Sequence, residues 1–512
     1  MDSGERRLRE LGYKQELKRE LTTFSNYAVS LSIVCISSGL TSLFQYGMRT
    51  GGPVVIIFGW IISSIMTLSV ALSMAEICSS FPTSGGLYFW AYYLASPKYA
   101  PVSAFFTGYF NLLGQFAVSA SIDFGLALML GGTISSVVDT FVPTPPIIIA
   151  LHFAIVASHC IMNSLGMKVL RVLNDISGVW QAVAPFVVVV TVLVFSRNNL
   201  RDAEFVFTHF ENQTGFASSA YVALIGVLMA QYTLTGYDAS AHMTEETKRA
   251  DVAGPVGMIL AVLVSFLVGL FFLIGLLFSV QDYNSVLNTR TNFPVTQILL
   301  DATGPTGTII LMTLLIVACW FCGLASITAN SRMIYAFSRD GALPASKIWH
   351  RLGSNGIPLN AVFLSSFVAF ILALPYLGNS TAYGAVTSVA TIGLYLSYGS
   401  PILCKVLFRR FTPGAFRLPF STLINTIALL WIAFITVLFV LPQVNPVTAE
   451  SMNYASVAVG ALTIGTLLGW VFDAHRWFKG PVANIEPEET LESDSPFKVT
   501  MSAVPTDEKN LA

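Results

Sequence analysis

The chain of 512 residues is 54% hydrophobic and only 11% charged, and its formal net charge is −1. A soluble domain carries about a quarter charged residues, so this composition excludes an ordinary soluble protein. It indicates an all-α integral membrane protein with the lipid bilayer as its environment and no nucleic-acid partner. Each of its helices would cross roughly 30 Å of hydrocarbon with about 20 apolar residues.

Twelve apolar segments are long enough to cross a membrane. In chain order they cover approximately residues 25–46, 53–75, 101–131, 145–163, 172–195, 216–241, 255–280, 305–333, 357–377, 383–404, 420–441 and 454–472. They predict one twelve-helix domain over residues 25–473. Residues 1–24 are charged and lack the apolar stretch of a signal peptide, so we expect a cytosolic tail. Residues 474–512 become acidic and contain proline, so we expect a second, mostly disordered cytosolic tail.

The first and sixth segments are each interrupted by a short polar break that contains glycine. The breaks are residues 36–40 (ISSGL) and residues 234–238 (LTGYD). In hydrocarbon an unpaired N–H or C=O costs several kcal/mol, so a helix opens there only where the freed groups face protein, water or a ligand. Broken helices in corresponding positions of two halves indicate a substrate site near the middle of the membrane. The pair of breaks therefore predicts a transporter.

The basic residues predict the orientation, because cytoplasmic flanks carry an excess of lysine and arginine. With both ends in the cytosol, 23 of the 27 basic residues lie inside, and the outer loops hold only Arg49, Arg197, Arg201 and Arg290. Two glycosylation sequons, at Asn212 and Asn379, lie in loops that this topology places outside. We expect the plasma membrane, with an endomembrane or the mitochondrial membrane as the alternatives.

Three motifs carry a resemblance to a known family. They are residues 75–88 (AEICSSFPTSGGLY), residues 330–344 (NSRMIYAFSRDGALP) and residues 236–247 (GYDASAHMTEET). With the first break, they resemble the amino acid, polyamine and organocation transporter superfamily. The third motif is similar to the amino acid/choline transporter family, most of all to plant bidirectional amino-acid transporters and GABA permeases. The resemblance implies a LeuT-like fold, with spans one to five and six to ten as inverted repeats and two peripheral helices.

The resemblance also implies a binding site for a substrate carboxylate at the first break. The backbone N–H groups of Ser38, Gly39 and Leu40 would be its donors. A helix N-terminus offers unpaired donors and the positive end of a dipole, which makes an anion site without a buried cation. The family's common Gly-Ser-Gly is Ser37-Ser38-Gly39 here, so a hydroxyl stands where the pattern has close backbone approach.

The substrate ammonium would meet backbone carbonyls at Cys35, Tyr232 and Thr235, beside Gly236. Tyr232 lies where related transporters place an aromatic gate, and Tyr237 is a second gating candidate. The alternative for Tyr232 is an ordinary core aromatic, because 12% of the chain is aromatic.

Four polar residues within the spans are candidates for ion coupling or for structural hydrogen bonds. A carboxylate inside a span is costly unless it is paired, faces water or has a function. For Asp238 we favour capping of the helix that follows it over proton uptake, and for Asp123 a proton site and an interhelical hydrogen bond are equally supported. Ser326 and Asn330 could line an ion site near span one, although packing between helices is the favoured interpretation.

No feature indicates an enzyme, a metal site or a cofactor. The six cysteines sit in or beside apolar spans, which favours packed thiols, and the Cys319/Cys322 pair lacks further metal ligands nearby. No acid or histidine cluster converges at one depth, and no filter motif suggests a channel. We expect a secondary transporter of amino acids, GABA included, that works by alternating access. A choline or polyamine permease is the alternative, a membrane enzyme or channel is more remote, and H⁺ and Na⁺ both stay open as coupling ions.

Overall fold

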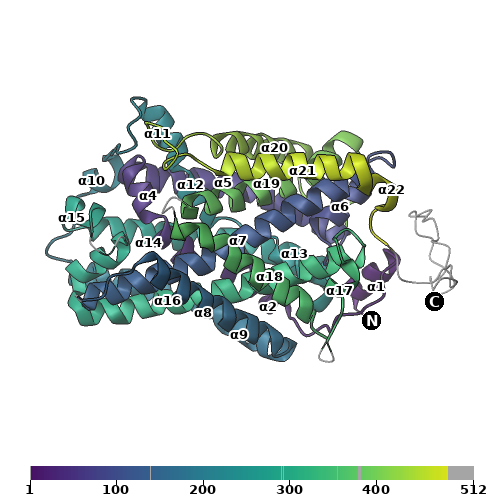
Figure 1. Ribbon diagram of the computed structural model, residues 1–512, viewed down its shortest axis with the longest axis horizontal. Coiled ribbons are helices and arrows are strands. Elements are labelled where there is room, and N and C mark those ends of the chain that lie inside the picture. The colour runs from purple at the N-terminus through teal and green to yellow at the C-terminus, as the bar shows by residue number, and fades with distance from the viewer. Residues whose placement is uncertain are drawn as a thin grey trace.

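The computed structural model describes residues 2–138, 140–289, 291, 293–353, 356–378 and 382–482. Within these residues the regular elements are helices, and the only β pairings are the isolated bridges Leu21 to Thr247 and Thr50 to Asn212. Most long helices run along the longest axis of the molecule (Figure 1). This arrangement confirms the prediction of an all-α membrane fold.

Eleven helical segments of the described chain are long and apolar enough to cross a membrane. They are α2 (Thr23–Ile33) with α3 (Ile36–Ser42), α5 (Gly52–Ser80), α7 (Ala100–Val137), α8 (Pro145–Ser164), α9 (Met167–Phe195), α14 (Ala250–Phe278), α16 (Pro294–Arg339), α18 (Leu359–Ala373) with η2 (Leu374–Leu377), α19 (Ala382–Phe408), α20 (Ser421–Leu438), and α21 (Ala455–Gly469) with η3 (Trp470–Ala474) and α22 (His475–Trp477).

The remaining predicted span, residues 216–241, is the one that the second break divides. It forms α11 (Ser219–Gly226), α12 (Leu228–Thr233) and α13 (Ala239–His242), each too short to cross a membrane alone. Shorter helices complete the described chain: α1 (Ser3–Glu10), α4 (Phe44–Arg49), α6 (Leu87–Leu94), α10 (Ala203–Thr208), η1 (Thr244–Glu246), α15 (Tyr283–Leu287) and α17 (Ser346–Trp349). Each of the twelve predicted spans therefore has a helical counterpart.

The third and eighth spans extend well beyond their predicted limits. Helix α7 has 38 residues and α16 has 46. Helix α16 is kinked at Gly304, whose φ of 71° and ψ of −178° are not helical, and the predicted span begins at the next residue, Pro305. The extra turns before Gly304 therefore form a separate helical piece.

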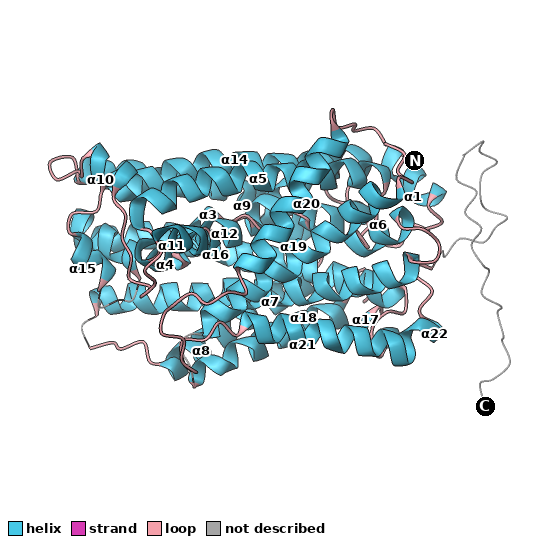
Figure 2. Ribbon diagram, turned by 90° about the horizontal axis from the view of Figure 1, so that it is seen from above, coloured by secondary structure: helices cyan, strands magenta, loops and turns pink. Residues whose placement is uncertain are grey.

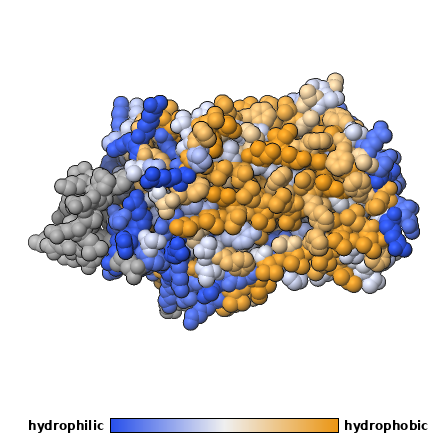
Figure 3. Space-filling view, turned by 180° about the vertical axis from the view of Figure 1, so that it is seen from behind, coloured by the Kyte–Doolittle hydropathy of each residue, from blue (hydrophilic) through white to orange (hydrophobic). Residues whose placement is uncertain are grey.

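The outer surface is apolar over the middle of the molecule and polar at both ends. Figure 3 shows this band on one face, and exposed side chains such as Phe153, Phe186 and Leu430 contribute to the apolar surface. Helix α21 is the most peripheral span, with only 11% of its most apolar stretch buried, whereas the corresponding value is 83% for α2 with α3 and for α7. Lipid tails can cover such a surface at no cost, so the chain is an integral, multi-pass membrane protein.

Both described ends of the chain lie at one end of the molecule, which we call the tail face. Helices α1 and α22 lie there, and α10 and α15 lie at the opposite end, the loop face (Figures 1 and 2). The N-terminal segment packs into the tail face rather than extending from it. Leu8 and Tyr13 are fully buried, and the amide of Leu21 donates to the carbonyl of Glu246 at 2.9 Å. The first 24 residues are therefore part of the folded domain over much of their length.

Candidate functional site

The first break separates α2 from α3. Cys35 is the N-cap of α3, and its carbonyl accepts from the amides of Ser38 at 3.2 Å and Gly39 at 3.0 Å. Its sulfur accepts from Ser38 as well, at 3.3 Å. The amides in the first turn that have no backbone acceptor are therefore those of Ile36 and Ser37. In this conformation the amides that are free to bind a carboxylate are thus those of Ile36 and Ser37. The family resemblance implies the amides of Ser38, Gly39 and Leu40 instead.

The second break separates α12 from α13 and turns at Gly236. This residue has a φ of 84°, and a Cβ there would lie 2.3 Å from Cγ2 of Ile33, so only glycine fits. The Tyr232 carbonyl accepts the hydroxyl of Thr235 at 2.6 Å, whereas the Thr235 carbonyl accepts no hydrogen bond from the described chain. Of the carbonyls expected to meet an ammonium, Thr235 is the one that remains free.

The two breaks pack against each other around a small cavity. A Cβ on Gly39 would lie 2.3 Å from Oγ1 of Thr233, so the backbone of α3 contacts the end of α12 directly. The cavity is lined by Ile33, Cys35, Ser38, Gly39, Val118, Ile122, Tyr232, Thr233, Thr235 and Cys322. Five of the seven predicted substrate residues are among them, and Leu40 and Gly236 are not. The set contains no charged side chain.

The cavity is closed in this conformation. Its volume of about 10 Å³ is room for roughly one water molecule. On one side the hydroxyl of Tyr232 donates to Oγ of Ser121 at 2.8 Å. Ser121 also lines a second cavity, at the end of α18 and the start of α19, together with Phe124 and Tyr383. Tyr232 thus lies between the two cavities, which is the position that a gate toward the loop face requires. The other gating candidate, Tyr237, packs its ring 5.2 Å from the ring of Tyr398 and lines neither cavity.

Asp238 does not cap α13, contrary to the expectation from sequence. Its backbone has helical angles, φ −66° and ψ −11°, and its side chain makes no capping hydrogen bond. A side-chain cap needs an extended N-cap residue. The amide of Ser240 is capped from another helix instead, by Oγ of Ser30 at 2.9 Å. The carboxylate of Asp238 accepts from Tyr398 at 2.7 Å, Gln115 at 3.0 Å and Asn111 at 3.3 Å.

Asp123 is paired with a histidine that the sequence did not connect to it. Its Oδ1 lies 3.1 Å from Nδ1 of His159, and both side chains are fully buried. A Cβ on Gly323 would lie 2.0 Å from the same oxygen, so this glycine gives the carboxylate its space. The pair joins α7 to α8 against α16, one residue from the cavity wall at Ile122.

Ser326 and Asn330 point away from the first break. The Ser326 hydroxyl lies 2.7 Å from that of Ser119 on α7, and Nδ2 of Asn330 donates to Ser365 on α18 at 2.8 Å. Both are interhelical contacts of the kind that polar side chains make in membrane bundles. This geometry favours the packing interpretation over an ion site.

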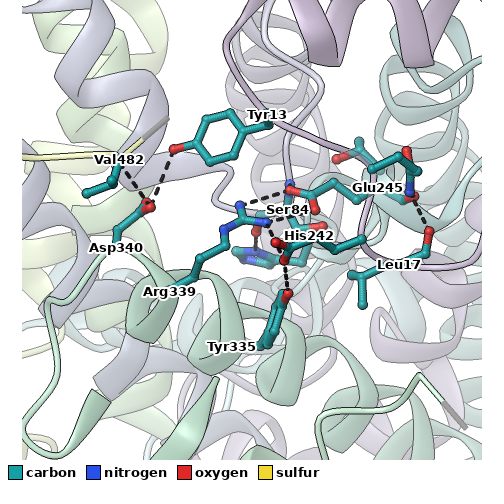
Figure 4. Close-up of polar contacts among 12 residues, drawn as sticks. Tyr13, Leu17, Ser84, His242, Glu245, Tyr335, Arg339, Asp340 and Val482 are labelled. Atoms are coloured by element: carbon teal, nitrogen blue, oxygen red, sulfur yellow. Dashed lines mark hydrogen bonds and ion pairs between the residues drawn. The ribbon is translucent and has the colours of Figure 1, made fainter. Parts of the chain in front are cut away.

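A polar cluster at the tail face was not anticipated from the sequence. Arg339, at the end of α16, donates to both carboxylate oxygens of Glu245 at 3.1 and 3.2 Å (Figure 4). The neighbouring Asp340 accepts from the hydroxyl of Tyr13 at 3.4 Å and the amide of Val482 at 3.2 Å. Burial raises the pKa of Asp340 to about 6. These contacts join the N-terminal segment, η1, α16 and the C-terminal segment, and they close the tail face.

The structure describes one of the two candidate glycosylation sites. Asn212 is exposed beside α10 at the loop face, and its Nδ2 donates to the Phe216 carbonyl at 2.7 Å. Asn379 lies outside the described residues.

Comparisons with known proteins agree with this architecture. A family model described as amino acid permease matches residues 21–464. The chain is 44% identical over 503 residues to the amino-acid permease BAT1 homolog of Oryza sativa subsp. japonica, covering 95% of this chain and 96% of that protein. It is equally similar to amino-acid permease BAT1 of Arabidopsis thaliana, covering 95% and 97%. Amino-acid permease 2 of Neurospora crassa is 31% identical, covering 94% and 90%. The chain therefore belongs to the amino acid permease family, and it is a multi-pass membrane transporter of amino acids rather than an enzyme.

Proposed function

We propose that the chain transports amino acids by alternating access, with the substrate held where the two breaks meet. The observation that carries this proposal is the cavity lined by residues of both breaks. Because it holds only about one water in the closed conformation, the substrate enters after the helices around it have moved apart. The same geometry supports a LeuT-like arrangement with two inverted repeats, in which such breaks lie near the membrane midplane.

The wall of the cavity favours recognition of the two ends that all amino acids share. The first turn of α3 starts beside the cavity at Cys35 and has free amides at Ile36 and Ser37, which do not line the closed cavity. With the positive end of the helix dipole, these amides suit a carboxylate once the helices have moved apart. The free carbonyl of Thr235 suits an ammonium. No charged side chain lines the cavity, so a substrate with a neutral side chain fits better than one with a second charge. GABA has the same two ends, whereas choline has no carboxylate for the amides.

We further propose that the tail face is cytosolic and that the membrane is the plasma membrane. The excess of lysine and arginine on the side of both termini supports this orientation. The exposed Asn212 on the loop face supports it from the opposite side.

Exchange in proteoliposomes tests the proposal. Vesicles containing the purified full-length chain are loaded with an unlabelled amino acid and offered labelled neutral, acidic and basic α-amino acids, GABA and choline. We expect saturable uptake of neutral amino acids that is stimulated by substrate on the opposite side. Uptake of choline without uptake of any amino acid would overturn the assignment of the α3 amides to a carboxylate. Uptake that neither saturates nor responds to substrate on the opposite side would overturn alternating access.

A further inference from the structure

A continuous chain of buried hydrogen bonds runs from the second break to the tail-face cluster. The amide of Gly236 donates to the hydroxyl of Tyr398 at 3.2 Å, and that hydroxyl donates to Oδ1 of Asp238 at 2.7 Å. Oδ2 of Asp238 lies 3.2 Å from Nε2 of His242, one helical turn later. Both members of this pair are fully buried. We call them the Asp238–His242 pair.

The chain continues from His242 to the ion pair that closes the tail face. Nδ1 of His242 lies 3.1 Å from the carbonyl of Ser84, and the amide of Ser84 donates to Oε1 of Glu245 at 3.0 Å (Figure 4). Glu245 is the partner of Arg339. The imidazole ring rests against Gly86, where a Cβ would lie 3.3 Å from Cε1 of His242. His242 is thus the direct link between the substrate-binding break and the tail-face contacts.

The two contacts of the His242 ring require a bound proton in this pair. A carbonyl can only accept, so Nδ1 of His242 must carry the hydrogen that is donated to Ser84. Nε2 then faces a carboxyl oxygen at 3.2 Å, and two acceptors without a hydrogen between them would repel each other. One further proton therefore lies between His242 and Asp238.

The other partners of Asp238 show where that proton resides. The hydroxyl of Tyr398 accepts from Gly236 and so donates to Asp238, while Gln115 and Asn111 offer amide donors. Three donors stabilise the ionised carboxylate. The pair is consequently an aspartate with a doubly protonated histidine, and it is electrically neutral as a unit only while the proton is bound.

The charges around the pair are otherwise balanced. Glu245 on η1 and Arg339 on α16 neutralise each other. The neighbouring α2, α7 and α14 and the segment that precedes α6 present serine, glycine, amide and backbone groups to the pair and its helix. In the part of the chain that the structure describes, the titratable or charged side chains that face the pair are Tyr237, Tyr395, Tyr398, Glu245 and Arg339. Removal of the proton would leave the carboxylate of Asp238 without a countercharge, which is strongly unfavourable in a buried site.

We propose that the Asp238–His242 pair is a proton-binding site, open to the tail side, whose proton stabilises the conformation that is closed to that side. The proposal rests on the proposed transport function. When η1 and α16 separate, water reaches Ser84 and His242, and the imidazolium can release its proton to water to become neutral imidazole. Closure reverses the step, so each closing of the tail face takes up one proton from that side. A rise in pH at the tail face therefore favours opening.

The proposal is tested by measuring amino-acid exchange at different pH values. The full-length chain is inserted in one orientation in proteoliposomes, and labelled alanine is the substrate. The pH on the tail side is varied from 5.5 to 8 while the other side is held at pH 7. A single linked proton changes the equilibrium by at most about tenfold per pH unit. We expect the exchange rate to vary with pH on the tail side within this limit and to be insensitive to pH on the other side.

Two variants and one control make the test specific. His242→Gln should abolish the dependence on tail-side pH. The double variant Asp238→Asn/His242→Gln removes the proton without leaving a buried charge, and it should be equally insensitive to pH even if the single variant folds poorly. His350→Gln, at a histidine after α17 whose ring bonds to the carbonyl of Ser346, should keep the wild-type dependence.

The outcomes separate this inference from the proposed function. A dependence on tail-side pH that survives in the double variant overturns the proton site, as does a wild-type rate that is flat across the range. Either result leaves amino-acid exchange itself intact. Absence of exchange with every substrate and at every pH would instead refute the transport site at the two breaks.

Discussion

Substitution of Gly39 by alanine should slow transport because the two breaks touch at this residue. The new Cβ would lie 2.3 Å from Oγ1, 2.7 Å from Cβ and 2.8 Å from Cγ2 of Thr233. Heavy atoms cannot remain this close, so α3 and α12 must separate in the closed conformation. Overpacking of this kind costs about 1–3 kcal/mol. Since the proposed alternating-access cycle passes through the closed conformation, exchange should slow by roughly 5- to 140-fold, at 1.4 kcal/mol for each factor of ten.

The assay is amino-acid exchange in proteoliposomes, normalised to the amount of folded transporter recovered by size-exclusion chromatography. Gly460→Ala on the peripheral helix α21 is the matched control, because nothing lies within 4 Å of a Cβ at that position. The double variant Gly39→Ala/Thr233→Gly removes the atoms that clash and should recover part of the rate, which gives a coupling energy between the two positions. Wild-type exchange in the folded Gly39→Ala protein would refute the close approach of the breaks as the basis of transport.

Three further predictions concern topology, the second buried acid–histidine pair and the tail face. Asn212→Gln should remove a glycan from protein made in eukaryotic cells, and a glycan on a sequon engineered at Lys248 instead would reverse the orientation. Asp123→Asn should lower the free energy of unfolding by about 1–3 kcal/mol, because the buried ring of His159 loses the negative charge beside it. The dependence of exchange on tail-side pH should remain, and its loss would make Asp123 the proton carrier. The pKa of Asp340 is raised from 3.8 to about 6 by burial. The wild type should therefore lose up to about 3 kcal/mol of stability as pH rises from about 4 to 6, and a pH series of melting temperatures should show a smaller loss for Asp340→Asn.

The helices and breaks could be predicted from sequence because their causes are local. A span must be apolar over its whole length, and a break needs glycine and polar residues at the point where the helix opens, as at Gly236. Hydropathy underestimates the length of α16 because its first turns precede the Gly304 kink and carry polar residues that lower the local hydropathy. Hydropathy identifies the residues that are apolar enough to lie in the hydrocarbon, and it does not detect helical turns that extend beyond the membrane.

The partners of the buried polar residues could not be predicted, because they come from distant parts of the chain. Asp238 bonds to Gln115 and Tyr398, which are 123 and 160 positions away. The helix that follows Asp238 is the neighbour that the sequence displays, so the sequence suggests a capping role. His242 lies four residues after Asp238 in the motif of residues 236–247, so helical spacing alone can suggest that pair.

The two sides of the cavity are closed by contacts of different strength, and this difference has a consequence for the transport cycle. Toward the loop face the proposed gate, Tyr232, is held by one neutral hydrogen bond, to Ser121, worth about 0.5–1.5 kcal/mol. Toward the tail face, opening must separate η1 from α16, which are joined by the buried ion pairs Arg339–Glu245 and Arg332–Glu246.

A buried ion pair that loses one partner without hydration costs roughly 3–5 kcal/mol, so the tail face opens only as water enters to solvate the separated charges. The Asp238–His242 pair lies on the path that this water takes, next to Ser84 and Glu245. Release of its proton is possible at the moment when those charges become hydrated, and the neutral His242 then no longer favours reclosure. The proton site thus lies on the side of the cavity where opening is more costly, which is where a change in protonation has the larger effect on the cycle.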